Sequence, residues 1–260
     1  MSGAAADFLR LGGRVAIVTG GGRNIGRACA LRLAQAGAKV VVADYIEANA
    51  QDVAAEIEAL GGQALALPLD IANLASVQAM VAAVSQHFGT VHILVNNAAK
   101  FSSLTYKPMD EIPLQEWDEV IHTNITGSFY CAREVLPHMK REGWGRIINV
   151  SSGTYRMGRP LFLHYVSTKA AMMGMSRSMA RELGPHGITV NTVLPGVVLH
   201  GLQSSRLPED YKAMIQGMQC VPKPLDCDAL ADAVAFLGSD AARFITGQEL
   251  AVDGGLTHGG

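Results

Sequence analysis

The chain has 260 residues, of which 49% are hydrophobic and 17% charged, and a chain of this size and composition can bury a large core. Its formal net charge is −2, without the clustered Lys and Arg that nucleic-acid binding requires, so we expect no nucleic-acid partner. No apolar run reaches the ~18 residues of a membrane helix, and the first ten or so residues lack the apolar stretch of a signal peptide. We therefore expect a cytoplasmic protein with no membrane partner.

Short β-branched runs alternate with longer helical patterns along the chain. In chain order, the predicted strands are Val15 to Thr19, Val40 to Ala43, Ala64 to Leu67, Ile93 to Asn96, Ile147 to Val150, Thr189 to Val193 and Glu249 to Val252. The predicted helices between them are Ile25 to Ala36, Ile46 to Leu60, Leu74 to Phe88, Leu114 to Arg141, Phe162 to Leu183 and Asp226 to Leu237. Several strands are apolar throughout, which is typical of parallel strands covered on both faces. The pattern predicts a single α/β domain over residues 1–260, a Rossmann-like, doubly wound parallel sheet of about seven strands with helices on both faces.

One long segment, residues 197–224, has no regular pattern and carries His200, Gly201 and three prolines. It follows the sixth predicted strand, and ligands of open parallel sheets bind beyond the carboxyl ends of the strands. We therefore expect this segment to form a lid over a substrate.

Neither the cysteines nor the histidines form a recognisable ligand pattern. The cysteines are Cys29, Cys131, Cys220 and Cys227. Their spacings fit neither a disulfide framework nor a zinc site, so buried or inert thiols are the favoured interpretation. The histidines include no pair placed on one helix face as in metalloproteases. We predict no metal.

The first predicted strand runs into a glycine-rich turn, Thr19-Gly20-Gly21-Gly22-Arg23-Asn24-Ile25-Gly26, and then into a helix. A tight turn of this kind lets the backbone approach a pyrophosphate, which then binds free N–H groups at the helix N-terminus. A glycine turn alone is a weak motif, and a plain turn is the alternative. Asp44 ends the second predicted strand, where a carboxylate can accept hydrogen bonds from the ribose of a dinucleotide. Together these features predict a dinucleotide site; the alternative for Asp44 is a solvated strand end.

The charges at this site bear on the choice of cofactor. The Asp44 carboxylate would repel the 2′-phosphate of NADP, which favours NAD. Arg23 argues the other way, because a guanidinium in the turn can pair with that phosphate. We predict NAD as the cofactor, with NADP as the less favoured alternative.

Tyr165 and Lys169 lie four residues apart in one predicted helix and therefore share a face of it. This spacing arises by chance in many chains, so its significance depends on its context. Upstream, Ser151 and Ser152 end the fifth predicted strand, where the sites of open parallel sheets form. Structural roles are the alternatives, because the serines can cap the strand end and Tyr165 can pack in the core.

Taken together, these motifs resemble the short-chain dehydrogenase/reductase family over nearly the whole chain. The residues that carry the resemblance are the glycine turn, Asp70, Asn96-Asn97-Ala98, Asn124, Ser152, Tyr165-x-x-x-Lys169, Pro195-Gly196, Ile245-Thr246-Gly247-Gln248 and Val252-Asp253-Gly254-Gly255. Ser152 precedes Tyr165 by the family's usual spacing, 13 residues. Residues 143–149 and 164–169 are similar to the matching segments of bacterial NAD-dependent alcohol dehydrogenases, including those that act on aryl ketones.

The resemblance implies an NAD(H)-dependent oxidoreductase of secondary alcohols and ketones with four catalytic residues. Tyr165 would exchange a proton with the substrate oxygen, and Lys169 would lower the pKa of its phenol and bind the nicotinamide ribose. Ser152 would donate a hydrogen bond to the substrate oxygen. Asn124 would hold a water that links Lys169 to solvent, or, alternatively, only bind local backbone. The hydride chemistry would belong to the cofactor.

The resemblance also implies which residues bind the cofactor. Asp70 would accept a hydrogen bond from the adenine amino group, with helix capping as its alternative role, and Val198 would offer backbone groups to the nicotinamide carboxamide. The expected cofactor-binding residues are Gly20, Arg23, Asn24, Ile25, Gly26, Asp44, Asp70, Ile71, Asn97, Ala98, Tyr165, Lys169, Pro195, Gly196 and Val198.

Three positions depart from the family pattern. Asn24 replaces the middle glycine of the turn, which it can do because Asn tolerates positive φ. Ala99 replaces a glycine and adds a methyl group near the nicotinamide. His200 stands where a threonine is usual. It can replace the threonine as a donor to the nicotinamide carboxamide, face the substrate, or lie on the surface of the lid, and the sequence does not choose between these roles.

The sequence does not identify the substrate. The residues expected to contact it are Ser152, Thr154, Tyr155, His164, Tyr165 and His200, with Lys100, Phe101, Phe162 and residues 199–202 nearby. Aromatic side chains among them suit an aryl or alicyclic alcohol. The basic side chains Arg156, Lys100 and His200 suit a hydroxy acid or a polyol, although a solvated charge is the default interpretation of each.

Two other functions stay open. A 3-ketoacyl thioester reductase would prefer NADPH and need a basic patch for a carrier phosphate, and Asp44 speaks against it. A non-catalytic dinucleotide-binding protein would keep the fold without turnover, and the intact catalytic residues speak against that. The resemblance also implies a homotetramer or homodimer, to which Phe129, Tyr130 and residues 172–175 can contribute apolar faces, although core packing accounts for them equally well.

Overall fold

The protein is described by a computed structural model that covers residues 9–198 and 208–258. Within these residues, strands form one sheet in the order β3-β2-β1-β4-β5-β6-β7, and every neighbouring pair is parallel. The strands are β1 (Val15–Thr19), β2 (Lys39–Asp44), β3 (Gln63–Pro68), β4 (Ile93–Asn96), β5 (Gly145–Val150), β6 (Ile188–Pro195) and β7 (Glu249–Val252). The predicted doubly wound parallel sheet is confirmed.

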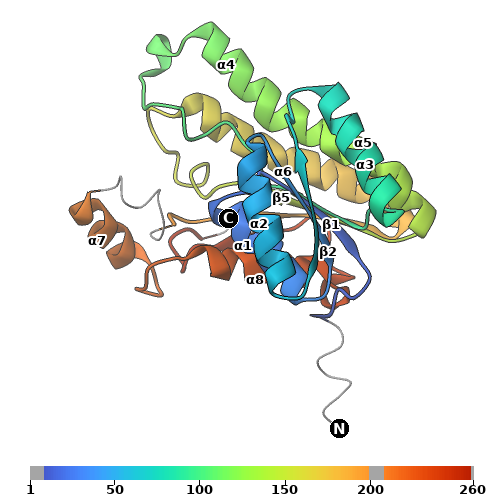
Figure 1. The fold of residues 1–260 in the computed structure, drawn as a ribbon. Coiled ribbons are helices and arrows are strands. Elements are labelled where there is room, and N and C mark those ends of the chain that lie inside the picture. The colour runs from blue at the N-terminus through green and yellow to red at the C-terminus, as the bar shows by residue number, and fades with distance from the viewer. Residues whose placement is uncertain (1–8, 199–207, 259–260) are drawn as a thin grey trace.

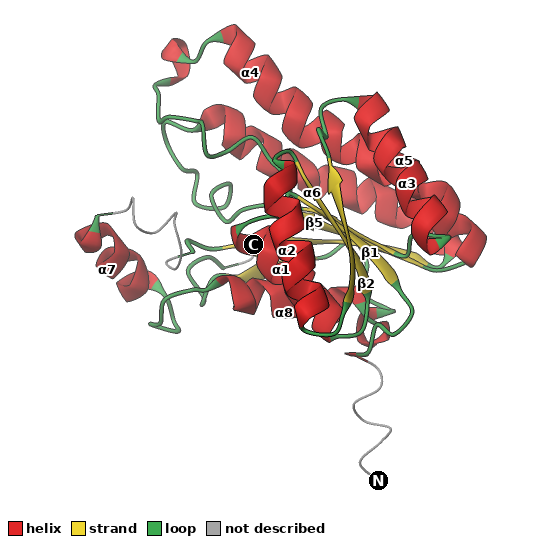
Figure 2. Ribbon diagram, viewed as in Figure 1, coloured by secondary structure: helices red, strands yellow, loops and turns green. Residues whose placement is uncertain are grey.

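Helices cover both faces of this sheet, as Figure 2 shows. One face carries α1 (Asn24–Gln35), α2 (Glu47–Ala59) and α8 (Cys227–Gly238). The other carries α3 (Leu74–Phe88), α5 (Gly127–Glu142) and α6 (Leu163–Leu183). Two further helices complete the fold. α4 (Leu114–Ile121) comes before α5 and contacts α6, and α7 (Glu209–Met218) stands to one side in Figure 1.

Two apolar cores hold the layers together, one on each face of the sheet. Val18 and Val40 pack in the core beneath α1, α2 and α8, whereas their chain neighbours Ile17 and Val41 pack in the core beneath α3, α5 and α6. Consecutive residues of a strand point to opposite faces of the sheet. Because both faces are covered, most positions of the central strands are apolar, which explains the long apolar runs in the sequence.

A ladder of buried polar side chains links β4, β5, α6 and β6. Asn96 Nδ2 donates to Asn149 Oδ1 at 2.9 Å, and Asn149 Nδ2 donates to Ser176 Oγ at 2.8 Å. Ser176 Oγ shares a further hydrogen bond of 2.8 Å with Thr192 Oγ1. A buried polar group that loses its partner costs ~1–3 kcal/mol. The ladder therefore opposes any shift of α6 along the sheet.

Two segments differ from the sequence-based prediction. The helix predicted from Leu114 to Arg141 is divided, because α4 ends at Ile121 and a π-helical turn over His122–Thr126 separates it from α5. The π turn lies within a continuous helical run, and such single turns have no sequence pattern of their own. Residues 197–224 are not irregular throughout, since they include α7. This helix buries only Ile215, too little to produce a periodic apolar pattern.

The strand order brings the predicted functional residues to one edge of the sheet. It reverses between β1 and β4, which creates a crevice at the carboxyl ends of these strands. The glycine turn follows β1, Asn97 follows β4, and Ser151 and Ser152 follow β5. Segments that are far apart in the sequence therefore meet at this edge (Figure 1).

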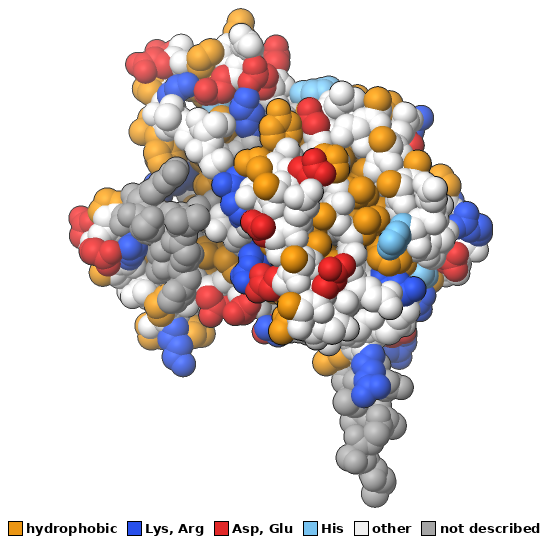
Figure 3. Space-filling view, viewed as in Figure 1, with side chains coloured by type: hydrophobic (Ala, Val, Ile, Leu, Met, Phe, Trp, Pro, Cys, Tyr) orange, Lys and Arg blue, Asp and Glu red, His pale blue; other side chains and the backbone are white. Residues whose placement is uncertain are grey.

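The surface carries both signs of charge. On the face that Figure 3 shows, acidic and basic side chains are interspersed among apolar and uncharged groups. Among the described helices, none has the length and apolar character needed to cross a membrane.

We predict that Gly26→Ala disrupts the glycine turn. The added Cβ would lie 2.0 Å from the carbonyl oxygen of Gly20, a backbone atom of the same turn. We expect urea unfolding to show a loss of roughly 2–3 kcal/mol in the free energy of unfolding. Gly174→Ala, within α6, is the matched control because nothing lies within 4 Å of its Cβ, and it should stabilise the chain by about 0.5–1 kcal/mol. Equal effects of the two substitutions would contradict the prediction.

Candidate active site

The glycine turn after β1 adopts the backbone conformation that its residues allow. Gly20 and Asn24 both have positive φ, 62° and 48°, a region that only glycine enters freely and that Asn tolerates better than most other residues. The structure thus confirms that Asn24 can stand in a turn position usually held by glycine. Gly26 lies against the carbonyl of Gly20 with no room for a side chain.

The turn presents unpaired backbone donors at the start of α1. The first helical bond of this segment runs from Arg27 N–H to the Arg23 carbonyl at 3.1 Å, so the N–H groups of Asn24, Ile25 and Gly26 precede the helical ladder. No side chain among the described residues caps α1, and no acidic residue stands in its first turn. A helix N-terminus that is uncapped and approached closely by glycine fits the pyrophosphate of a dinucleotide.

Asp44, at the end of β2, faces this turn. Its Oδ2 accepts a hydrogen bond from Gly22 N–H at 2.9 Å, and its Oδ1 accepts one from Ile46 N–H at 3.0 Å. Each carboxylate oxygen has a second acceptor site, so Asp44 can bind ribose hydroxyls while it holds the turn. Asp70, after β3, accepts from Ala72 N–H at 3.0 Å in a local turn. Helix capping, its alternative role, falls to Asn73, whose side chain accepts from the N–H groups of Ala75 and Ser76 at the start of α3.

The residues after β4 brace the same turn. Asn97 Nδ2 donates to the carbonyls of Thr19 and Gly20, both at 3.0 Å, and the N–H groups of Asn97 and Ala98 donate to Thr19 Oγ1 at 3.1 Å. The carboxamide of Asn97 is therefore engaged with the backbone of the turn. Asn97 therefore positions the glycine turn, and contact with a cofactor would be a further role.

The far end of the site lies after β6. Gly196 N–H donates to the Val252 carbonyl at 3.0 Å, and a Cβ on Gly196 would lie 2.7 Å from Cβ of Asp253. Val198 forms a parallel bridge with Leu225. Pro195, Gly196 and Val198 thus sit at the same sheet edge as the glycine turn, as the dinucleotide site requires.

Tyr165 and Lys169 are buried in α6, one turn apart, against the end of β5. Lys169 Nζ donates to the Val150 carbonyl at 2.7 Å, and Ser151 Oγ donates to the Lys169 carbonyl at 2.7 Å. Lys169 Nζ also lies 5.6 Å from the centre of the Tyr165 ring. These contacts confirm that the two side chains share one helix face, and they place the ammonium beside the phenol.

Ser152 and Thr154 complete this corner of the site. Ser152 Oγ accepts hydrogen bonds from the Thr154 hydroxyl at 3.0 Å and from the Thr154 N–H at 3.3 Å. With its acceptor capacity engaged, the Ser152 hydroxyl keeps its own hydrogen for donation to another oxygen. Ser152 lies close enough to the Tyr165 phenol to affect its pKa.

Asn124 lies in the π-helical turn between α4 and α5 and is buried. Its Oδ1 accepts from Lys100 N–H at 2.7 Å, and its Nδ2 donates to Thr168 Oγ1 at 3.1 Å. Thr168 in turn donates to the carbonyl of Tyr165 at 2.7 Å. The carboxamide therefore ties the loop after β4 to the helix that carries Tyr165.

Burial shifts the pKa of both members of the pair. Desolvation lowers the pKa of Lys169 from 10.5 to about 8. Desolvation also raises the pKa of Tyr165 well above its ordinary value, and the hydrogen bond with the Ser152 hydroxyl opposes this rise only in part. At neutral pH the free protein therefore holds a protonated amine beside a neutral phenol. This is a proton donor with a fixed positive charge beside it.

An aromatic cluster surrounds Tyr165. The ring centres of Phe101 and Phe162 lie 5.0 Å and 4.9 Å from that of Tyr165, and Tyr106 lies 5.0 Å from Phe162. Phe101 and Phe162, expected near the substrate, are thus both in contact with the reactive tyrosine. Their apolar surfaces reduce the access of water to the phenol.

Two residues predicted to contact the substrate have other partners in the structure. The Tyr155 hydroxyl binds Glu249 of β7, which also accepts from Arg156 at 3.1 Å. The His164 side chain is fully buried, and its Nε2 pairs with Glu116 Oε1 at 3.2 Å. Their contact with substrate stays a prediction. His200 and Leu199 to Leu202 lie outside the described residues.

Sequence reasoning missed several residues that hold this site in place. Thr168 supports Asn124, although it lies beside Lys169, which the motif identifies. Glu116, which binds Lys107 at 2.9 Å as well as His164, has no motif of its own. A signal existed for Thr168 alone, which lies one turn after Tyr165 on the same helix.

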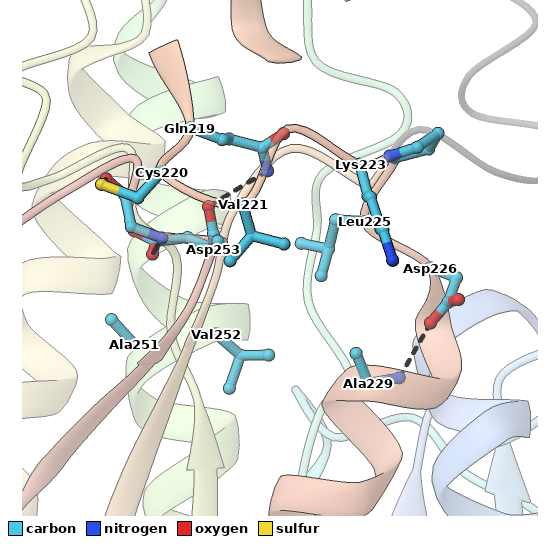
Figure 4. A pocket seen from close by; sticks show the side chains of 13 residues that line it. Gln219, Cys220, Val221, Lys223, Leu225, Asp226, Ala229, Ala251, Val252 and Asp253 are labelled. Atoms are coloured by element: carbon cyan, nitrogen blue, oxygen red, sulfur yellow. Dashed lines mark hydrogen bonds between the residues drawn. The ribbon is translucent and has the colours of Figure 1, made fainter. Parts of the chain in front are cut away.

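A pocket of about 530 Å³ opens near the base of the predicted lid. Figure 4 shows its lining, from the segment before α8, the start of α8 and the end of β7. Gln219 Nε2 donates to the Asp253 carbonyl at 3.1 Å there, and Gln219 Oε1 is buried without a partner among the described residues. None of the four predicted catalytic residues lines this pocket.

Known proteins match this chain over nearly its whole length. A family model described as enoyl-(acyl carrier protein) reductase matches residues 20–257. The 3-oxoacyl-(acyl-carrier-protein) reductase of Staphylococcus aureus is 40% identical over 243 residues, which are 93% of this chain and 97% of the relative. The protein of the same name from Escherichia coli is 37% identical over 245 residues, 94% of this chain and 97% of the relative.

A solved structure is also similar to this chain, both in fold and in sequence. It is a 7α-hydroxysteroid dehydrogenase complexed with NADH and 7-oxo glycochenodeoxycholic acid. It superimposes with a TM-score of 0.91 at 34% sequence identity, and the match covers 96% of each chain.

We predict that the buried charge of Lys169 costs stability, and that the cost depends on pH. Between pH 8 and 10 the unfolded chain keeps a proton that folded Lys169 has released, so the free energy of unfolding rises with pH through this window. The shift from 10.5 to about 8 corresponds to about 3 kcal/mol when complete. Lys169→Met should remove this rise, as measured by urea unfolding at several pH values.

The control for this experiment is Lys140→Met, the same substitution at an exposed position of α5. It should leave the pH dependence as in the parent chain. If Lys169→Met and Lys140→Met gave the same slope between pH 8 and 10, the buried ammonium would not be the source of it.

Proposed function

The chain belongs to the short-chain dehydrogenase/reductase family of oxidoreductases, and on this premise we propose that it transfers a hydride between NAD(H) and a secondary alcohol or ketone. The observation that carries the proposal is the placement of Lys169. Its ammonium is bonded to the end of β5 and lies beside the Tyr165 ring, with Ser152 next to the same phenol. In this arrangement Tyr165 provides a proton, Lys169 provides the positive charge that balances the phenolate, and Ser152 provides a hydrogen-bond donor beside them.

In the reductive direction, Tyr165 gives its phenolic proton to the ketone oxygen as the alcohol forms. The nicotinamide, when bound, supplies the hydride to the carbonyl carbon. In the oxidative direction, the phenolate takes the proton back from the alcohol. Because Tyr165 is buried among aromatic rings, its charged form depends on the support of neighbouring groups.

Lys169 and Ser152 supply that support. The ammonium stabilises the phenolate that remains after proton donation, since opposite charges at close range favour each other in a buried site. The Ser152 hydroxyl, oriented by Thr154, donates to the substrate oxygen where negative charge develops. Asn124 holds the helix that carries Tyr165 and, in our proposal, a water through which the proton of Lys169 is exchanged with solvent.

We assign NAD as the cofactor in preference to NADP. The uncapped start of α1 would hold the pyrophosphate, and Asp44 and Asp70 would bind the ribose and adenine. Both oxygens of Asp44 already accept backbone hydrogen bonds, which hold the carboxylate in place. A fixed carboxylate at the ribose supports NAD because it repels a 2′-phosphate. The NADH named with the similar hydroxysteroid dehydrogenase supports the same choice.

A second candidate function is reduction of a 3-oxoacyl thioester. It is favoured by the names of the relatives from Staphylococcus aureus and Escherichia coli, and the same four catalytic residues would serve it. Asp44 speaks against the NADPH that we expect such a reductase to prefer. A non-catalytic role is the third possibility, and turnover of any ketone would exclude it.

The remaining proposals concern the setting of the enzyme. We propose that residues 197–224, which include α7, act as the substrate lid of a single NAD(P)-binding domain. We further propose a cytoplasmic homotetramer or homodimer. Phe129 of α5 is 45% exposed and supplies an apolar surface for such an assembly, which light scattering would detect.

We predict that Tyr165→Phe abolishes turnover while the fold is kept. Loss of the proton donor should lower kcat/KM by roughly 10²–10⁴-fold for the best substrate in a panel of secondary alcohols and ketones assayed with NAD(H) and NADP(H). Tyr130→Phe, the same change in α5, is the control and should retain activity. A Tyr165→Phe enzyme as active as the parent would contradict the assignment of the proton donor.

We predict that Asp44→Asn shifts the preference toward NADP(H). Removal of the negative charge ends the repulsion of the 2′-phosphate, so the ratio of kcat/KM for NADPH to that for NADH should rise on the order of tenfold or more. Asp70→Asn removes the same charge where we expect adenine to bind, and it should weaken both cofactors without changing the ratio. A parent enzyme that prefers NADPH would falsify the choice of NAD.

A further inference from the structure

Arg159 lies between two tyrosine rings in the loop that joins β5 to α6. Its guanidinium carbon is 5.2 Å from the centre of the Tyr106 ring and 5.3 Å from the centre of the Tyr211 ring. Arg159 also donates to the Tyr211 hydroxyl at 2.6 Å. Tyr106 belongs to the segment between β4 and α4, and Tyr211 belongs to α7. One guanidinium therefore joins three segments that are distant in the sequence.

Arg159 differs from the neighbouring cations because it has no carboxylate partner among the described residues. The others are paired: Lys100 with Glu119, Lys107 with Glu116, Arg156 with Glu249, and Lys212 with Glu209. Residues 199–207 contain no Asp or Glu, so they offer no counter-ion either. A partly buried guanidinium without a counter-ion is an unfavourable arrangement unless an anion from outside the chain completes it.

Successive aromatic contacts connect Arg159 to the reactive tyrosine. Tyr106 contacts Phe162 with ring centres 5.0 Å apart, and Phe162 contacts Tyr165 with ring centres 4.9 Å apart. A ketone that meets the Tyr165 hydroxyl can extend along these rings toward the guanidinium. A substrate that followed this row of rings would have an elongated apolar body with its two polar groups at opposite ends.

On the basis of the proposed function, we propose that Arg159 binds an anionic group, a carboxylate or a phosphate, at the end of the substrate remote from its ketone. A guanidinium offers five N–H donors in a planar fork that matches both anions, and Tyr211 engages only one of its nitrogens. The contacts with the two rings and the Tyr211 hydroxyl restrict the Arg159 side chain, so less side-chain entropy is lost on binding. The substrate class is therefore an oxo acid or a phosphate-bearing oxo thioester.

The test uses pairs of ketones that differ in one anionic group. One pair is 7-oxo glycochenodeoxycholate and its primary amide, and the other is acetoacetyl phosphopantetheine and acetoacetyl pantetheine. Each is assayed at saturating NADH or NADPH with the parent enzyme, Arg159→Gln and Arg177→Gln. The last is the matched control, because Arg177 is an exposed cation of α6 whose partner is Glu249.

We expect the parent enzyme to favour the charged member of at least one pair by roughly 10–100-fold in kcat/KM, the range for a hydrogen bond to a charged group. This ratio should approach one in Arg159→Gln and persist in Arg177→Gln. Arg159→Lys keeps the charge without the fork and should retain part of the ratio. The pair that shows the preference identifies carboxylate or phosphate as the anion.

Binding of the same compounds, measured by calorimetry with reduced cofactor present, separates this inference from the proposed function. Tighter binding of the charged member without any reduction would contradict the function and support the anion subsite. Equal use of both members of each pair, or a preference that survives Arg159→Gln, would overturn the subsite and leave the function standing. A loss in Arg159→Lys as large as in Arg159→Gln would overturn it too, because packing would then explain the effect.

Discussion

The site depends on one buried hydrogen bond, from the ammonium of Lys169 to the carbonyl of Val150 at the end of β5. The bond from Ser151 back to the Lys169 carbonyl completes the connection, so α6 and β5 are joined in both directions. Ser152 follows this strand end and Tyr165 precedes Lys169 by one helical turn, and both side chains are thereby brought to one point. A desolvated cation is costly, as its pKa of about 8 reflects, and the chain bears this cost where proton transfer needs a fixed positive charge.

Groups of different charge lie at different positions along the same edge of the sheet. The start of α1 presents N–H donors, Asp44 places a carboxylate near them, and Lys169 supplies a cation at the reacting end. Beyond the aromatic cluster, Lys100, Lys107 and Arg156 are neutralised by carboxylates, whereas Arg159 has no carboxylate partner among the described residues. A dinucleotide carries negative phosphates, and an oxo acid or phosphate-bearing thioester carries a negative end. In our proposal, the N–H donors and cations of the site are therefore complementary to two anions, the dinucleotide and the substrate. The two react at the uncharged ketone of the substrate.

Much of this arrangement was predictable because local chemistry determines it. The apolar strands, the tolerance of Asn24 for positive φ, and the shared face of Tyr165 and Lys169 follow from short-range rules, and the structure agrees with them. The π turn that carries Asn124 was not predicted, because the helical run continues through it from α4 into α5 without a break that the sequence would mark. Nor were the partners of Tyr155, His164 and Arg159, because Glu249, Glu116 and Tyr211 lie on elements far away in the sequence. Sequence identifies reactive residue types well and long-range side-chain pairings poorly.

Transfer of deuterium tests the central claim most directly. The enzyme would reduce a ketone with NADH that carries deuterium at C4 of the nicotinamide, and mass spectrometry and NMR would locate the label in the alcohol. Direct hydride transfer with Tyr165 as the proton donor predicts deuterium at the carbinol carbon, on one face of it, and none there when D₂O is the only source of deuterium. An alcohol that takes its carbon-bound hydrogen from solvent, or that carries the cofactor label on both faces, would contradict the account.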